Sequence, residues 1–225
     1  YLSEQALDST ENYFQKRQKT NFNIKRLQLI KSHIKGNVLK NNLSRAVAFE
    51  ELMKIENQDN HEKFLQNFLL VNTSKSYLKE VLDLHNDIQN MSAGKILPEL
   101  KLQDHQLNTI STVKLIDKPT VFYFWSQTQM SHYKNTIIKV KDLEKRFPKY
   151  DFKGICIQPF NEIVFEVHRM MNIDPKTQLA FTNFDKDSKK WVLSLLNRAI
   201  IVEANREIKE GFANFSSIDF ENLLY

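Results

Sequence analysis

The chain has 225 residues and a mass of 26.6 kDa, enough for one large domain or two small ones and for a core without disulfides. Hydrophobic residues make up 41% and charged residues 26%, which disfavours disordered, collagen-like and membrane-spanning classes. With only 4 glycines, the chain lacks glycine-rich phosphate loops and dinucleotide fingerprints. Its single cysteine, Cys156, excludes an internal disulfide and a cysteine-based metal site.

Basic residues exceed acidic ones by 32 to 27, which gives a formal net charge of +5. Much of the excess lies in one segment without acids, formed by Lys16, Arg17, Lys19, Lys25, Arg26, Lys31, Lys35 and Lys40. Such a run is typical of a solvated helix face, and the alternative is a patch for anionic lipid or nucleic acid. No aromatic-and-glycine pattern accompanies it, so we expect no nucleic-acid partner.

The first ninety residues have the apolar periodicity of helices. The positions are Leu2, Ala6, Leu7, Tyr13 and Phe14, then Ile24, Leu27, Ile30, Ile34 and Val38, then Leu43, Val47, Leu52 and Ile55, then Phe64, Leu65, Phe68 and Leu69, and finally Leu78, Val81, Leu82, Leu84 and Ile88. They predict about four helices. The composition changes at Met91-Ser92-Ala93-Gly94, so we place an all-α domain at 1–92 and a second domain at 93–225.

Beyond this junction, strands and helices alternate. We predict, in chain order, a buried strand at 119–125, a helix at 130–147, a strand at 152–157, a helix at 163–170, a short helix at 191–196, a strand at 199–202, a hairpin turn at 205–206 and a helix at 217–224. This order indicates an α/β domain with a central mixed sheet flanked by helices.

Several landmarks in this second part resemble those of one family. They are Gly94 to Leu100 with Leu102 and Asp104, Lys118-Pro119-Thr120, Phe124-Trp125-Ser126, and the strands near 152–157 and 199–202. Over residues 94 to 225 the chain resembles the thioredoxin-like superfamily, specifically the periplasmic TlpA/ResA-type thiol-disulfide proteins. The resemblance implies a thioredoxin-like fold and a redox motif, WCxPC, directly after the Phe-Trp strand end.

That redox motif is missing. In the family, the first cysteine attacks a substrate disulfide as a thiolate at a helix N-terminus, and the second cysteine resolves the mixed disulfide. Gln129 and His132 occupy these two positions, so dithiol exchange is chemically impossible there. The family's cis-proline is also absent, because Asn197 stands in its place, and a non-proline residue favours the trans peptide bond.

Other chemistry has little support. Cys156 lies in a predicted buried strand, where a small core residue is a simpler interpretation than a reactive thiol. His132 is expected at the exposed edge of the former redox site, as a surface or partner-contacting residue. The alternatives are a general base or, with His105 or His168, a metal ligand. We expect no catalytic residues, no metal and no cofactor.

We therefore expect a redox-inactive, thioredoxin-like protein that binds protein partners or acts as a scaffold in a cell-envelope assembly. The expected contact surface is the degenerate groove, with Trp125, Met130, His132, Tyr133 and Asn197 as its residues. The helices could make the contacts instead. The enzymatic alternative is a thiol-disulfide or peroxide oxidoreductase that uses Cys156 intermolecularly.

The expected location follows from the resemblance. It implies a periplasmic protein, or one at the outer membrane, with peripheral membrane association or a lipid anchor left open. Because the chain begins with Tyr1 and not with Met, we expect a processed N-terminus from which any targeting or anchoring segment has been removed.

Overall fold

The computed structural model describes residue 15 and residues 19–55 and 60–225. The helix predicted over 2–14, together with Lys16 and Arg17 of the basic segment, lies outside the described residues. The chain divides into two compact units, 1–86 and 87–225. In the described part, no helix is long and apolar enough to cross a membrane.

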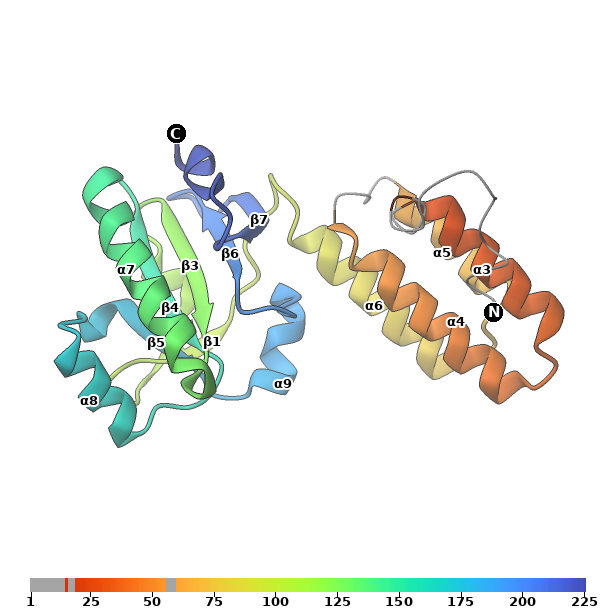
Figure 1. The fold of residues 1–225 in the computed structure, drawn as a ribbon, viewed down its shortest axis with the longest axis horizontal. Coiled ribbons are helices and arrows are strands. Elements are labelled where there is room, and N and C mark those ends of the chain that lie inside the picture. The colour runs from red at the N-terminus through yellow and green to blue at the C-terminus, as the bar shows by residue number, and fades with distance from the viewer. Residues whose placement is uncertain (1–14, 16–18, 56–59) are drawn as a thin grey trace. The chain divides into compact units, whose positions relative to one another are not determined.

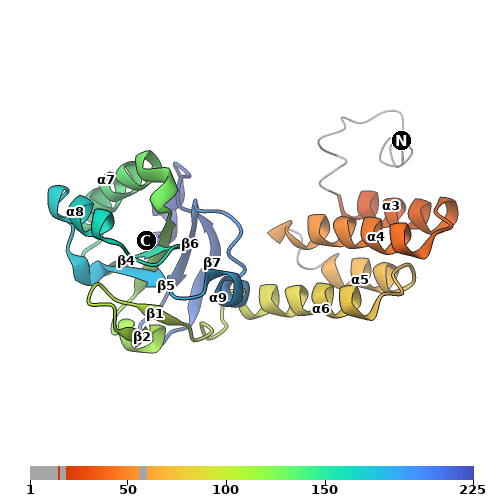
Figure 2. The ribbon, with the colours of Figure 1, turned by 90° about the horizontal axis from the view of Figure 1, so that it is seen from below.

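The described part of the first unit is helical, as the periodicity predicts. Its helices are α3 (Thr20–His33), α4 (Asn37–Leu52), α5 (His61–Leu69) and the start of α6 (Lys75–Asn90), which is shared with the second unit (Figures 1 and 2). The apolar face of each helix is buried, as Leu27, Val47, Phe64 and Val81 illustrate. Burial of such amphipathic faces against each other supplies most of the stability of a helical bundle.

The second unit contains a seven-stranded mixed sheet in the order β2-β1-β5-β4-β3-β6-β7. The strands are β1 (Lys101–Gln103), β2 (Thr109–Ser111), β3 (Thr120–Trp125), β4 (Asp151–Cys156), β5 (Gln178–Phe181), β6 (Arg198–Val202) and β7 (Ile208–Asn214). The central strands β3, β4 and β5 are parallel, and the remaining neighbours pair antiparallel. The helices α7 (Met130–Arg146) and α8 (Glu162–Met170) make the two parallel crossovers. The expected thioredoxin-like architecture is confirmed.

Both faces of β3 are buried because each is covered by other elements. Val121, Tyr123 and Trp125 point into a core shared with α7, α8 and the C-terminal 3-10 helix at Phe220–Leu224. On the opposite face, Phe122 and Phe124 contact the ring of Trp191, at centroid distances of 5.3 and 6.3 Å. An unbroken apolar strand is therefore required at this position.

Some sequence predictions were wrong. Strands β1, β2 and β5 were not foreseen, since the first two have 3 residues each and β5 begins with a polar residue, Gln178. In place of a helix at 191–196, a short helix α9 (Phe184–Asp187) continues as a 3-10 helix that ends at Trp191. Val192 then adopts a left-handed conformation with φ of 52°. The buried Arg198 guanidinium holds this turn by donating to the carbonyls of Trp191 and Val192.

Candidate functional site

The candidate site lies at the carboxyl edge of β3. A 3-10 turn, Gln127–Gln129, connects β3 to α7, so Gln129 and His132 follow the strand directly. The register of β3 with β6 pairs Tyr123 with Ala199 in antiparallel orientation, which places Asn197 level with Trp125. The structure therefore brings the three residues of the degenerate redox motif to one edge of the sheet.

Gln129 and His132, the two positions that the resemblance aligns with the redox cysteines, differ in exposure. Gln129 is exposed at the N-cap of α7, and its side chain makes no cap hydrogen bond. His132 is half-buried, and its Nδ1 atom is buried without a hydrogen-bond partner in the described part of the chain. Neither an amide nor this imidazole supplies the thiolate that disulfide exchange requires.

Two predicted surface residues lie in the core instead. Trp125 and Tyr133 are both essentially inaccessible to solvent, so their assignment to an exposed apolar rim was wrong. The reason is that their rings stack on each other, with centroids 3.9 Å apart, between the sheet and α7. Of the other predicted contact residues, Met130, His132 and Asn197 remain half-buried.

The Tyr133 hydroxyl joins a hydrogen-bonded chain through this core. It lies 2.8 Å from His168 Nε2 and donates to Gln178 Oε1 at 3.3 Å, while Gln178 Nε2 donates to the Tyr123 hydroxyl at 2.8 Å. Burial raises the pKa of both tyrosines well above the usual range. Burial also lowers the pKa of His168 to about 4, so this imidazole is neutral at physiological pH.

Cys156 lies beneath a set of amide and hydroxyl side chains that the sequence analysis did not identify. We call Ser126, Gln127, Gln158 and Asn161 the amide cluster. Gln158 Nε2 donates to Ser126 Oγ at 2.9 Å, and its Oε1 accepts from the backbone N–H of Gln127 at 3.0 Å. Asn161 Nδ2 donates to Gln127 Oε1 at 2.7 Å, and Gln127 Nε2 donates to the Pro159 carbonyl at 2.6 Å.

The amide cluster also contacts the thiol. Gln127 Nε2 lies 3.7 Å from Cys156 Sγ, and the thiol lies 3.6 Å from Gln158 Oε1. Cys156 is fully buried, and this burial raises the pKa of its thiol above the ordinary value. A buried thiol with a raised pKa is a poor nucleophile, because the reactive species is the exposed thiolate.

The backbone next to Asn197 is engaged within the fold. Phe215 N–H donates to the Asn197 carbonyl at 2.6 Å, and the Asn197 side chain donates to Asn214 Oδ1 at 3.2 Å. Among the described residues every peptide bond is trans, including the one before Asn197. The Asn197 carbonyl thus already accepts a backbone hydrogen bond within the fold. Leu195, two residues before Asn197, is an exposed large hydrophobic residue, at 64% exposure.

The histidines considered as metal ligands, His132 with His105 or His168, lie in different surroundings. His168 packs against Trp125 and Tyr133 inside the core, whereas His105 lies in the turn between β1 and β2. In the part of the chain that the structure describes, no group of three or more His, Cys, Asp or Glu side chains is arranged to hold a metal ion.

Among known proteins, the chain is similar only to solved structures, and the similarity is one of fold. No protein-family model matches the chain. No curated protein sequence matches it either. Among solved structures, the thioredoxin domain of a thiol-disulfide oxidoreductase from Bacteroides vulgatus is similar, with 16% identity, 52% of this chain and 85% of that chain covered, and a TM-score of 0.43.

Two further solved structures are similar to the same extent. A thiol:disulfide interchange protein from a Bacteroides species has 15% identity, coverage of 52% of this chain and 78% of that chain, and a TM-score of 0.43. A thiol peroxidase from Chromobacterium violaceum has 14% identity, coverage of 59% and 83%, and a TM-score of 0.48. The fold assignment itself rests on the strand order and connections described above.

Proposed function

We propose that this chain is a redox-inactive, thioredoxin-like protein that works by binding a protein partner in the bacterial cell envelope. The envelope location follows from the family resemblance of residues 94 to 225. The observation that carries the proposal is the state of the chain's one thiol. Cys156 is fully buried beneath the amide cluster. The two positions that hold the redox cysteines in the family that the chain resembles are occupied here by Gln129 and His132.

The contact surface that we propose lies at the carboxyl edge of β3. With Trp125 and Tyr133 in the core, this edge keeps the exposed Gln129 and Leu195 and the half-buried Met130, His132 and Asn197. The adaptable thioether of Met130 and the exposed side chain of Leu195 both suit contact with apolar side chains of a partner.

An insulin-reduction assay tests the redox part of the proposal. The wild type is expected to show no turnover above background with dithiothreitol, and Cys156→Ser is expected to behave identically. The double variant Gln129→Cys with His132→Cys is the positive control, because it restores thiols at the two exchange positions. Turnover by the wild type that disappears in Cys156→Ser would establish the oxidoreductase alternative and overturn the proposal.

Site-specific photo-crosslinking tests the binding part. A photoreactive amino acid at Leu195 or Met130 is expected to give one dominant crosslinked species in living cells of a bacterial host that carries the protein. Ile138 and Ile163 are matched control positions, since both are exposed aliphatic residues on α7 and α8, at 67% and 69% exposure. Equal crosslinking from all four positions, or none at Leu195 and Met130, would contradict a partner at this edge.

A further inference from the structure

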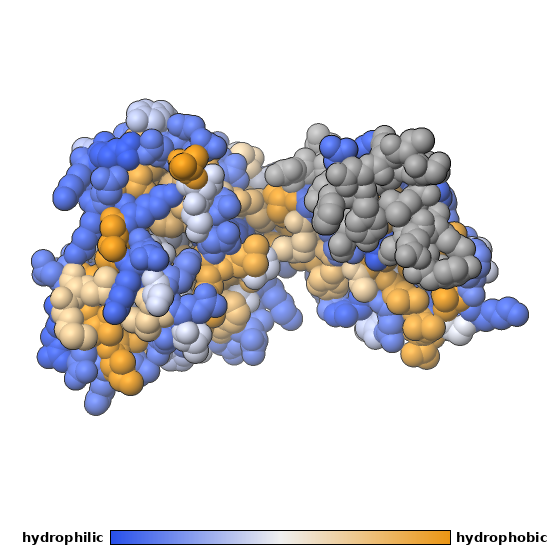
Figure 3. Space-filling model, in the orientation of Figure 1, coloured by the Kyte–Doolittle hydropathy of each residue, from blue (hydrophilic) through white to orange (hydrophobic). Residues whose placement is uncertain are grey.

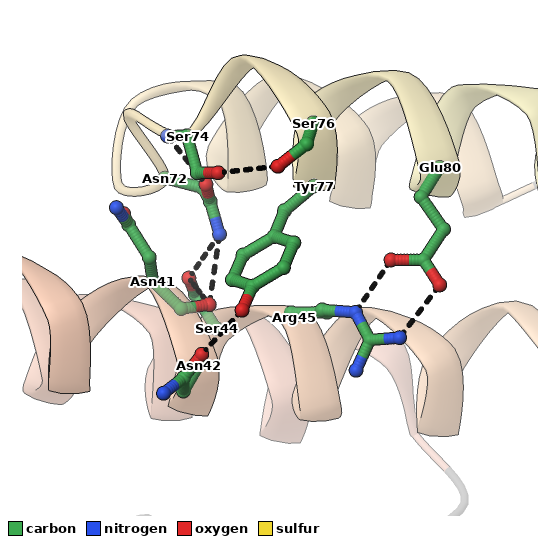
Figure 4. Close-up of polar contacts among 9 residues, drawn as sticks. All are labelled: Asn41, Asn42, Ser44, Arg45, Asn72, Ser74, Ser76, Tyr77 and Glu80. Atoms are coloured by element: carbon green, nitrogen blue, oxygen red, sulfur yellow. Dashed lines mark hydrogen bonds and ion pairs between the residues drawn. The ribbon is translucent and has the colours of Figure 1, made fainter.

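One end of the helical unit carries two turns, one between α3 and α4 and one between α5 and α6. The turn between α3 and α4 brings the chain to Asn37, and the turn between α5 and α6 covers 70–74. Side chains of α4 hold the second turn, as Figure 4 shows. Asn72 Nδ2 donates to the Asn41 carbonyl and to Ser44 Oγ, both at 2.9 Å. The Tyr77 hydroxyl donates to Asn42 Oδ1 at 2.8 Å.

Large aliphatic side chains protrude from this end. Val38 and Leu39 begin α4, one turn before Asn41 and Asn42, and are 78% and 52% exposed. Leu69 and Leu70 end α5 and are 47% and 67% exposed. Figure 3 shows apolar residues gathered at the lower right of the helical unit, where Figure 1 places the starts of α4 and α6. We call these four residues the aliphatic tip.

The same end is basic. Lys31, Lys35 and Lys40 flank the first turn, Lys75 follows the second, and residues 19–49 contain no acid. In the part of the chain that the structure describes, none of these four lysines forms an ion pair. The first two acids of α6, Glu80 and Asp83, already pair with Arg45 and Lys79. Among the described residues, no ion pair therefore compensates the charge of these four lysines.

We propose that this end of the helical unit is a docking surface for an anionic lipid bilayer. Lysine ammonium groups would lie at the headgroups, and the aliphatic tip would enter the boundary between headgroups and acyl chains. The proposal does not depend on the function assigned to the carboxyl edge of β3, because it concerns a different unit.

The chemistry of the tip favours a bilayer over a nucleic acid. Binding of single strands uses exposed aromatic rings and arginines, on which bases stack. The aliphatic tip carries neither type, and two candidates on the neighbouring helices, Tyr77 and Arg45, are engaged with Asn42 and Glu80. A convex pair of turns also meets a deformable lipid surface without requiring a complementary groove.

Vesicle flotation tests the proposal with the full chain. The wild type is expected to float with vesicles of phosphatidylglycerol and phosphatidylcholine in equal parts, and not with pure phosphatidylcholine. Lys31→Gln with Lys35→Gln and Lys40→Gln is expected to weaken partitioning by about a hundredfold, since each cation near an anionic surface contributes about fivefold. Val38→Ser with Leu39→Ser and Leu70→Ser is expected to weaken it by about tenfold, because the inserted apolar area is lost.

A matched variant separates insertion from general loss of apolar surface. Ile163→Ser with Met170→Ser removes two aliphatic side chains of similar exposure, 69% and 78%, from α8 and is expected to partition as the wild type. Bromolipids quench the fluorescence of a tryptophan that enters the bilayer, so the variant Val38→Trp reports the depth of insertion. Ile163→Trp is the control and is expected to show no quenching. Absence of flotation at low salt, full retention by the serine triple variant, or tighter binding to an oligonucleotide would each overturn the proposal.

Discussion

The indole ring of Trp125 and the phenol ring of Tyr133 stack with their centroids 3.9 Å apart and their planes 17° from parallel. Trp125 ends β3 and Tyr133 lies in the first turn of α7, so the stack fixes the helix on the strand. In this chain, residues next to the former redox position thus stabilise the fold from within.

Replacing Tyr133 with phenylalanine keeps this stack but removes a buried hydroxyl. We expect Tyr133→Phe to lower the free energy of unfolding by about 1–3 kcal/mol, because His168 and Gln178 each lose a hydrogen-bond partner. Urea unfolding followed by tryptophan fluorescence measures this, since both tryptophans, Trp125 and Trp191, lie in the second unit. Tyr225→Phe is the control at an exposed position, and an equal loss there would contradict the interpretation.

Acidification is expected to destabilise the second unit through His168. Burial lowers the pKa of His168 to about 4, whereas the unfolded chain has a value near 6.5, so the unfolded state binds more protons between these two values. The free energy of unfolding should fall by about 2 kcal/mol between pH 6.5 and pH 5 from this group. In His168→Gln that contribution should vanish. Identical pH profiles of the wild type and His168→Gln would refute the assignment.

Gly154 makes room for the hydrogen-bonded chain in the core. A Cβ atom there would overlap Gln178 Oε1 and would stand 2.7 Å from the Tyr123 hydroxyl. We expect Gly154→Ala to destabilise the second unit by about 1–3 kcal/mol, because the side chains that it overlaps are packed on all sides. Gly36→Ala is the control, since nothing lies within 4 Å of a Cβ there, and it should change stability by less than about 0.5 kcal/mol.

Asn72, in the turn between α5 and α6, connects that turn to α4 (Figure 4). Its side chain donates two hydrogen bonds to α4, and its Oδ1 accepts from the backbone N–H of Ser74 at 3.0 Å. We expect Asn72→Ala to lower the stability of the helical unit by about 2 kcal/mol, measured by circular dichroism at 222 nm. Ser76→Ala, at an exposed position beside it, should be nearly neutral. Equal stability of the two variants would show that the hydrogen bonds of the Asn72 side chain contribute nothing to the stability of the helical unit.

The amide cluster should control access to Cys156. In Gln127→Ala, the hydrogen bonds to Pro159 and Asn161 are lost, so local opening becomes less costly. We expect native-state alkylation of Cys156 by iodoacetamide to become about tenfold faster, which corresponds to roughly 1.4 kcal/mol of opening free energy. Gln129→Ala removes an exposed glutamine from the same turn and should leave the rate unchanged.

Sequence patterns predicted the elements whose burial is periodic and local. The continuous apolar run of β3 and the three-to-four spacing along α7 each specify one conformation, so both were predicted to within a residue or two. The absence of cysteine at positions 129 and 132 was equally a property of the sequence. Strands as short as β1 and β2 show no such period. They form through pairing, because β1 pairs with β5 and β2 pairs with β1.

The character of the candidate site depended on tertiary contacts. A tryptophan and a tyrosine next to a former active site are compatible with an exposed rim or with a core stack. Only the packing of α7 and α8 on β3 selects the stack. Likewise, nothing in the spacing of Gln127, Gln158 and Asn161 predicts that they meet over Cys156, because they come from separate segments that the parallel strands bring together. The sequence by itself determined which residues occupy positions 129, 132 and 197, and the tertiary structure decided which residues are buried, since burial depends on every neighbouring element.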